Sequence, residues 1–192
     1  MLYNHFIEFY TSIEKFSDYD YLLSILKFNM APVLDNKKIG GLIRIINGRK
    51  RLKDTWTKKK NELQKSLSLD FFEVKENKNS ILVYFYKSKK LVKRLNKNSI
   101  RSYLSEKGYR KCKSSADYLK VLKKNFQKTC PVEVGIFLGY PLVDVVLFGK
   151  GCQNYKCIGY WKCFYNKEKA LRTFSYYDKS KVGEMKSILR AS

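Results

Sequence analysis

The chain has one histidine among its 192 residues, and it lacks the common motifs of nucleotide binding and hydrolysis. No G-x-x-x-x-G-K-S/T phosphate loop, G-x-G-x-x-G, H-E-x-x-H or G-x-S-x-G sequence occurs. The histidine, His5, lies near the N-terminus, where exposure is usual, so a histidine-based general base is not predicted. The sequence therefore indicates no particular reaction or cofactor, and it does not decide whether the protein is an enzyme.

A long apolar run is also absent. The least polar stretch, residues 134–148, contains Pro141 and Asp144 and is shorter than the roughly 20 apolar residues that span a bilayer. The first residues carry no basic leader followed by an apolar run, so no secretory signal is predicted. We therefore expect a cytoplasmic protein without a membrane span.

The cysteines show no metal-binding or disulfide pattern. Their number is odd, no C-x-x-C spacing occurs, and a chain of this size does not need disulfides to fold. The last three are separated by four and five intervening residues, a spacing that is not typical of a zinc site. Reduced thiols and no metal are therefore expected. The five are Cys112, Cys130, Cys152, Cys157 and Cys163.

The composition predicts one packed domain. Hydrophobic residues make up 44% and aromatic residues 15%, which is too much for a disordered chain, and 192 residues is the size of one domain. Residues 1–68 are predicted to form a mainly helical part, in which Pro32 ends a helix and residues 42–46 fit either helix or strand. Residues 69–192 are predicted to contain the sheet.

A central hairpin is predicted within this second part, from residues 69–75 and 80–87. Both faces of its second strand are apolar, so that strand is expected to be central or covered on both sides. Residues 132–138 and 158–165 are predicted as two more strands, with helices after Pro141 and Asn166. The prediction is an α+β domain with a small sheet of three or four strands packed by several helices.

Positive charge is concentrated along the chain. Lys and Arg total 40 against 17 Asp and Glu, a formal net charge of +23. Residues 49–60 hold seven basic residues and one acid, residues 87–97 six and none, and residues 107–128 eight and one. Such segments bind phosphate polymers through counterion release, or they are simply solvated. No RNA-recognition, zinc-finger or helix-turn-helix motif favours the first alternative.

The residues predicted to bind RNA or DNA under that alternative belong to two of these segments. They are Arg49, Lys50, Arg51, Lys58, Lys59, Lys60, Lys89, Lys90, Lys93 and Arg94.

Two carboxylates stand out because they lie among apolar residues, where an unpaired charge is costly. Glu133 and Asp144 could form an acid–base pair in a small enzyme, provided that both reach one substrate. Alternatively, Asp144 favours the first turn of a helix and Glu133 pairs with a lysine. Between them, residues 138–141 form a turn before a helix, which could receive an anion or serve only as a turn.

The sequence resembles a known family in three blocks. Residues 133–145 read E-x-G-x-F-L-G-Y-P-x-x-D-V, residues 159–162 read G-Y-W-K, and residues 31–34 read A-P-V-L. The blocks resemble the DUF3793 family of clostridial and related anaerobic bacteria, whose function is unassigned. Members often have a histidine and a cysteine where this chain has Val132 and Met30. Neighbouring genes of the family imply a link to iron or redox housekeeping.

The matched residues lead to a prediction for the site. The glycines and prolines among them are explained by backbone geometry, and five of the other side chains are taken as informative. These five are Glu133, Tyr140, Asp144, Trp161 and Lys162. We expect them to line a pocket that holds a small ligand or a protein partner, with the rings supplying apolar contact and the lysine a charge. The identity of the ligand and the oligomeric state are not predicted.

Overall fold

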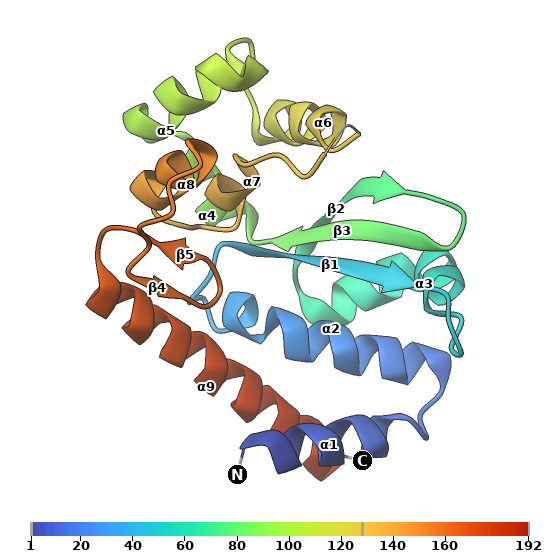
Figure 1. The fold of residues 1–192 in the computed structure, drawn as a ribbon. Coiled ribbons are helices and arrows are strands. Elements are labelled where there is room, and N and C mark those ends of the chain that lie inside the picture. Colours follow the sequence, from blue (N-terminus) through green and yellow to red (C-terminus); the bar gives the residue numbers. More distant parts are fainter. Residues whose placement is uncertain (1, 128, 192) are drawn as a thin grey trace.

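The computed structural model describes residues 2–127 and 129–191, with side chains from residue 6 onward, so the side chain of His5 lies outside the described part. The chain forms a single α+β domain, in which a three-stranded antiparallel sheet lies between two layers of helices (Figure 1). A two-stranded hairpin is added near the C-terminal helix. The predicted fold class is confirmed.

The strands of the sheet are β1 (Gly40–Ile46), β2 (Asp70–Glu76) and β3 (Ser80–Tyr86), in the order β1-β3-β2. The predicted hairpin is β2–β3, and its second strand is central, as expected. The ambiguous segment at 42–46 is a strand, because β1 pairs with β3 along its whole length. Ile81, Val83 and Phe85 pack on one face of the sheet, and Tyr84 packs on the other.

The first of these faces is covered by helices α2 (Asp18–Leu34) and α3 (Leu52–Leu67). Helices α1 (Leu2–Ile13) and α9 (Lys167–Ala191) pack on the outer side of α2. The prediction that Pro32 ends its helix is wrong by two residues. Pro32 lies in the last turn of α2, where its missing N–H removes one backbone hydrogen bond shortly before the helix ends.

Short helices cover the second face (Figure 1). They are α4 (Ser88–Leu95), α5 (Asn98–Leu104) with the π-helical turn η1 (Ser105–Tyr109), α6 (Ser115–Asn125), α7 (Val134–Phe137) and α8 (Leu142–Gly149). The capping box of α6 joins Ser114 to Asp117, and the S-x-x-D spacing of these two residues is typical of the start of a helix. No helix within the described ranges combines the length and the apolar character that crossing a membrane requires.

Two predicted strands are wrong. Residues 132–138 form turns and the helix α7, with the Ile136 amide donating to the Glu133 carbonyl, because a short apolar run suits a buried helix as well as a buried strand. In 158–165 the pairing is limited to β4 (Cys157–Ile158) and β5 (Lys162–Cys163). Beyond Cys163 the backbone amides of Phe164 and Tyr165 donate to the Asp144 carboxylate and not to a strand.

Candidate functional site

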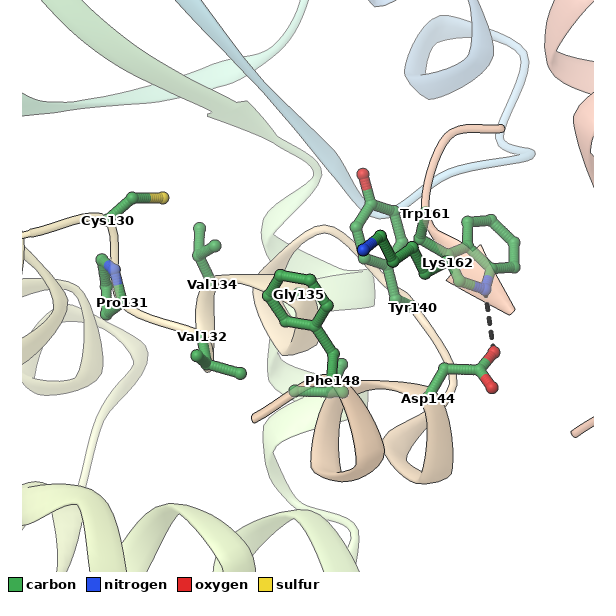
Figure 2. A pocket seen from close by; sticks show the side chains of 11 residues that line it. Cys130, Pro131, Val132, Val134, Gly135, Tyr140, Asp144, Phe148, Trp161 and Lys162 are labelled. Atoms are coloured by element: carbon green, nitrogen blue, oxygen red, sulfur yellow. Dashed lines mark hydrogen bonds between the residues drawn. The ribbon is translucent and has the colours of Figure 1, made fainter. Parts of the chain in front are cut away.

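Four of the five predicted site residues line one cavity of about 290 Å³ (Figure 2). Tyr140 comes from the turn between α7 and α8, Asp144 from α8, and Trp161 and Lys162 from the β4–β5 hairpin. The rest of the wall is largely apolar. It consists of Cys130, Pro131, Val132, Val134, Gly135, Val145 and Phe148. The cavity thus lies between residues 130–148 and the β4–β5 hairpin that follows them.

Asp144 holds these two segments together. One carboxylate oxygen, Oδ2, accepts a hydrogen bond from Trp161 Nε1 at 2.8 Å, and the other accepts from the amides of Phe164 and Tyr165 at 2.8 and 3.2 Å. The side chain is 3% exposed. It also lies in the first turn of α8, as one of the sequence alternatives predicts. Both carboxylate oxygens are therefore committed to positioning the hairpin.

The aromatic wall is formed by Tyr140 and Trp161. Their rings stack with centroids 5.0 Å apart, and Trp161 also contacts Phe174 of α9 edge-on at 4.5 Å. A Cβ atom on Gly159 would lie 2.5 Å from the Phe174 ring, so a glycine is needed there for the hairpin to lie on α9. Trp161 is therefore held from three sides, by Tyr140, Phe174 and Asp144.

Lys162 supplies a cation beside this wall. Its ammonium nitrogen lies 5.8 Å from the ring centroid of Phe148 and 5.1 Å from that of Tyr155, within cation–π distance. Both rings are about half exposed. Among the described residues, no carboxylate forms an ion pair with Lys162. Its charge is thus available to an anionic group of a ligand.

The fifth predicted residue, Glu133, does not line the cavity. It is 5% exposed and accepts hydrogen bonds from the Tyr109 hydroxyl at 3.1 Å and from Asn125 Nδ2 at 2.7 Å. Burial first, and then Glu133, raise the pKa of Tyr109 well above its ordinary value. Glu133 and Asp144 are bound by different partners, so the acid–base pair gains no support.

Most of the predicted polyanion-binding residues contact their own chain. Five of them form ion pairs: Arg49 with Glu14, Lys50 with Asp18, Arg51 with Asp54, Lys59 with Glu62 and Lys60 with Glu73. The Lys90 ammonium and the Arg94 guanidinium donate to the backbone carbonyls of Asn36 and Tyr140. Lys58, Lys89 and Lys93 are exposed. A polyanion would have to compete for most of this set.

Met30 and Val132, the two positions at which the chain departs from the family, lie on different faces of the sheet. Met30 is buried with α2 and α3 on one face of the sheet, where its sulfur lies 2.8 Å from the position of a Cβ on Gly41. Val132 packs against the core on the other face and lines the cavity. Position 132 thus belongs to the candidate site and position 30 does not. Across the described ranges, no three His, Cys, Asp or Glu side chains are grouped to hold a metal ion.

Lys38 is a residue that the sequence analysis did not single out. Its ammonium nitrogen lies 5.6 to 5.8 Å from the ring centroids of Tyr140, Tyr160 and Tyr177. Burial, and then the nearby Lys181, lower the pKa of Lys38 from 10.5 to about 8. No local pattern reveals this contact, because Lys38 follows α2 and the three rings come from residues more than a hundred positions later.

The stability of the protein is expected to depend on pH through Lys38. Since the unfolded chain keeps this proton up to a higher pH, the folded state is penalised below about pH 8, and the penalty is lost as the pH rises toward 10.5. Lys38→Met should raise the free energy of unfolding near neutral pH by about 1 to 2 kcal/mol, and by less at about pH 9.5. Urea denaturation at both pH values measures this, with Lys37→Met as control. An equal gain at the two pH values would contradict the prediction.

Comparison with known proteins places the chain in a family. The sequence model of DUF3793, described as a protein of unknown function, matches residues 26–192 and so includes the whole cavity wall. No curated protein and no solved structure matches the chain. Since the match extends over most of the sequence, the resemblance of the three motif blocks is confirmed, and the chain belongs to the DUF3793 family.

Proposed function

We propose that this protein binds a small, largely apolar molecule that carries an anionic group, in the cavity between α7, α8 and the β4–β5 hairpin. The observation that carries the proposal is the convergence of Tyr140, Trp161 and Lys162 on one concave wall, from the turn before α8 and from the β4–β5 hairpin. Sites for small molecules are typically apolar hollows of roughly 300 Å³ or more with a few polar groups that orient the ligand. The cavity has this character.

Each group has a distinct part in the proposed binding. The stacked rings of Tyr140 and Trp161, together with the valines and Phe148, supply apolar contact. Lys162 lies beside exposed rings without a carboxylate partner among the described residues, so an anionic group would gain an ion pair with it. Asp144 acts as a positioning residue, because its oxygens hold Trp161 and the backbone beyond β5.

A fluorescent probe of this chemistry tests the proposal. We expect 8-anilinonaphthalene-1-sulfonate, which joins apolar rings to a sulfonate, to bind the folded protein at a saturable site. Val134→Phe should fill the cavity and abolish binding, whereas Lys162→Gln should weaken it by about tenfold through loss of the ion pair. A fluorescence titration measures both effects. Native mass spectrometry of the purified protein would then reveal a bound molecule that Val134→Phe loses.

Two variants serve as matched controls. Val92→Phe makes the same change on α4 at a position that is 42% exposed, and Lys186→Gln removes an exposed charge of α9. Neither residue lines the cavity. Both variants should bind the probe like the parent protein, and circular dichroism should show that all four are folded. Unchanged binding by folded Val134→Phe and Lys162→Gln would refute the proposal.

The basic surface supports the alternative, RNA or DNA binding, less well. Five of its ten predicted residues already contact carboxylates of the same chain. Exposed ion pairs are weak, so the phosphates of a nucleic acid could replace the carboxylates. No contact in the structure, however, favours binding of RNA or DNA to these side chains over their solvation by water. The cavity, in contrast, brings together aromatic rings and a lysine, which suit an apolar molecule with an anionic group.

A further inference from the structure

A second cavity, of about 380 Å³, borders the same two residues, Asp144 and Trp161. More charged side chains line it than line the first cavity, beside apolar residues such as Val143 and Ala170. Lys37 comes from the loop after α2, Arg94 from α4 and Lys169 from the first turn of α9. Asn166 and Thr173 add polar side chains. Three segments that are far apart in the sequence thus contribute basic side chains to the wall of one hollow, and the Lys37 ammonium also lies 5.5 Å from the ring centroid of Tyr176.

These charges are not neutralised within the chain. Among the described residues, none of the three cations forms an ion pair with a carboxylate. Among the described residues that line the wall, Asp144 is the only acid, and its two oxygens already accept three hydrogen bonds. Three cations and one carboxylate leave a net charge of +2 around the cavity. A phosphoryl group, at about −1.5 to −2 near neutral pH, matches this excess better than a carboxylate does.

The Arg94 guanidinium has unused hydrogen-bonding capacity. Its Nη2 donates to the Tyr140 carbonyl, which anchors the group, whereas Nε is buried and has no hydrogen-bond partner. Burial also lowers the pKa of Arg94, which shows that its surroundings oppose the charge. An oxyanion beside the guanidinium would stabilise its charge.

The start of α9 adds to the positive potential. This helix runs from Lys167 to Ala191, and its capping residue Asn166 and first-turn residue Lys169 both line the cavity. Asn166 Oδ1 accepts a hydrogen bond from the backbone amide of Lys169 at 3.0 Å, which caps the first turn of the helix. The aligned peptide dipoles of a long helix favour an anion at this end. Here the helix end supplements three side-chain cations.

We propose that this second cavity binds the phosphoryl group of a small molecule, through Arg94, Lys37 and Lys169. This site is distinct from the apolar cavity, and the two share Trp161 and Asp144 as a common border. The phosphoryl group can belong to free phosphate or to a phosphate ester. The proposal does not depend on the ligand of the apolar cavity.

The test is a titration of the isotopically labelled full chain with inorganic phosphate, followed by NMR, and a second titration with glycerol 2-phosphate. We expect saturable shifts of the amides around Asn166 and Lys169 that sodium chloride at equal ionic strength does not produce. Lys37→Gln and Lys169→Gln should each weaken binding by about tenfold. Tighter binding of the ester would identify a phosphorylated small molecule as the ligand, and equal or tighter binding of phosphate would identify the free ion.

Controls separate this site from the general charge of the protein. Lys93→Gln on α4 and Lys179→Gln on α9 remove exposed cations that do not line the cavity, and both variants should bind phosphate like the parent chain. Absence of saturation, or equal weakening by all four lysine variants, would overturn the proposal. Val134→Phe should keep phosphate binding and Lys169→Gln should keep binding of the fluorescent probe, so that failure of one site is distinguishable from failure of the other.

Discussion

Replacement of Asp144 by alanine is expected to lower the free energy of unfolding by about 3 to 5 kcal/mol. The substitution removes the acceptor of three hydrogen bonds and leaves Trp161 Nε1 and the amides of Phe164 and Tyr165 without it in a buried setting. The β4–β5 hairpin would lose its attachment to α8, and with it the aromatic wall of the cavity. Urea denaturation followed by circular dichroism measures the loss.

Two further variants make this result interpretable. Asp144→Asn keeps an acceptor oxygen and should cost only about 1 to 3 kcal/mol, which also provides a folded protein if the alanine variant does not fold. Asp35→Ala removes an exposed aspartate at the end of α2 and should change stability by less than about 0.5 kcal/mol. A cost below about 1 kcal/mol for Asp144→Ala would show that the three bonds do not hold the hairpin.

Glu133→Ala is expected to destabilise the fold by about 2 to 4 kcal/mol and to leave ligand binding by the folded protein unchanged. The Tyr109 hydroxyl and the Asn125 amide both donate to this carboxylate, and alanine would leave them without it in the core between α6 and α7. Because Glu133 does not line the cavity, its loss removes no contact with a bound molecule. Urea denaturation and titration with the fluorescent probe measure the two effects separately.

The conservative variant distinguishes a structural role from a functional one. Glu133→Gln keeps an oxygen acceptor for both donors and should cost about 1 kcal/mol, with unchanged affinity for the probe. Glu106→Ala, at an exposed position of η1, is the matched control and should have no measurable effect. Loss of probe binding in folded Glu133→Gln would place the carboxylate in the site after all.

Local patterns predicted those parts of the fold that depend on neighbours in the sequence. The two apolar faces of β3 follow from alternation with period two, so its central place could be predicted before any contact was known. The caps at Ser114 and Asn166 form hydrogen bonds with residues three positions later, which is also local information. The strand predicted for residues 132–138 was wrong because an apolar segment without a hydrophobic period suits a helix and a strand equally.

The candidate site was predictable in part for the same reason. Tyr140, Asp144, Trp161 and Lys162 were chosen from motif blocks, and the structure places all four on one cavity. Glu133 belongs to the same block, but it precedes α7, and its carboxylate contacts Tyr109 and Asn125 whereas its neighbours Val132 and Val134 line the cavity. Successive side chains point in different directions along the backbone, and a motif block does not say which of them face a shared cavity.

The sequence by itself determined the fold class, the central hairpin, the helix caps and four residues of one cavity, because each depends on short-range spacing or on a motif. Only the tertiary structure decided which charged side chains share a cavity or contact an aromatic ring. Lys37, Arg94 and Lys169 come to one hollow, Lys38 comes to three tyrosine rings, and Asp144 binds the backbone beyond β5. Such contacts join segments distant along the chain, and their free energy depends on burial and geometry that no local pattern contains.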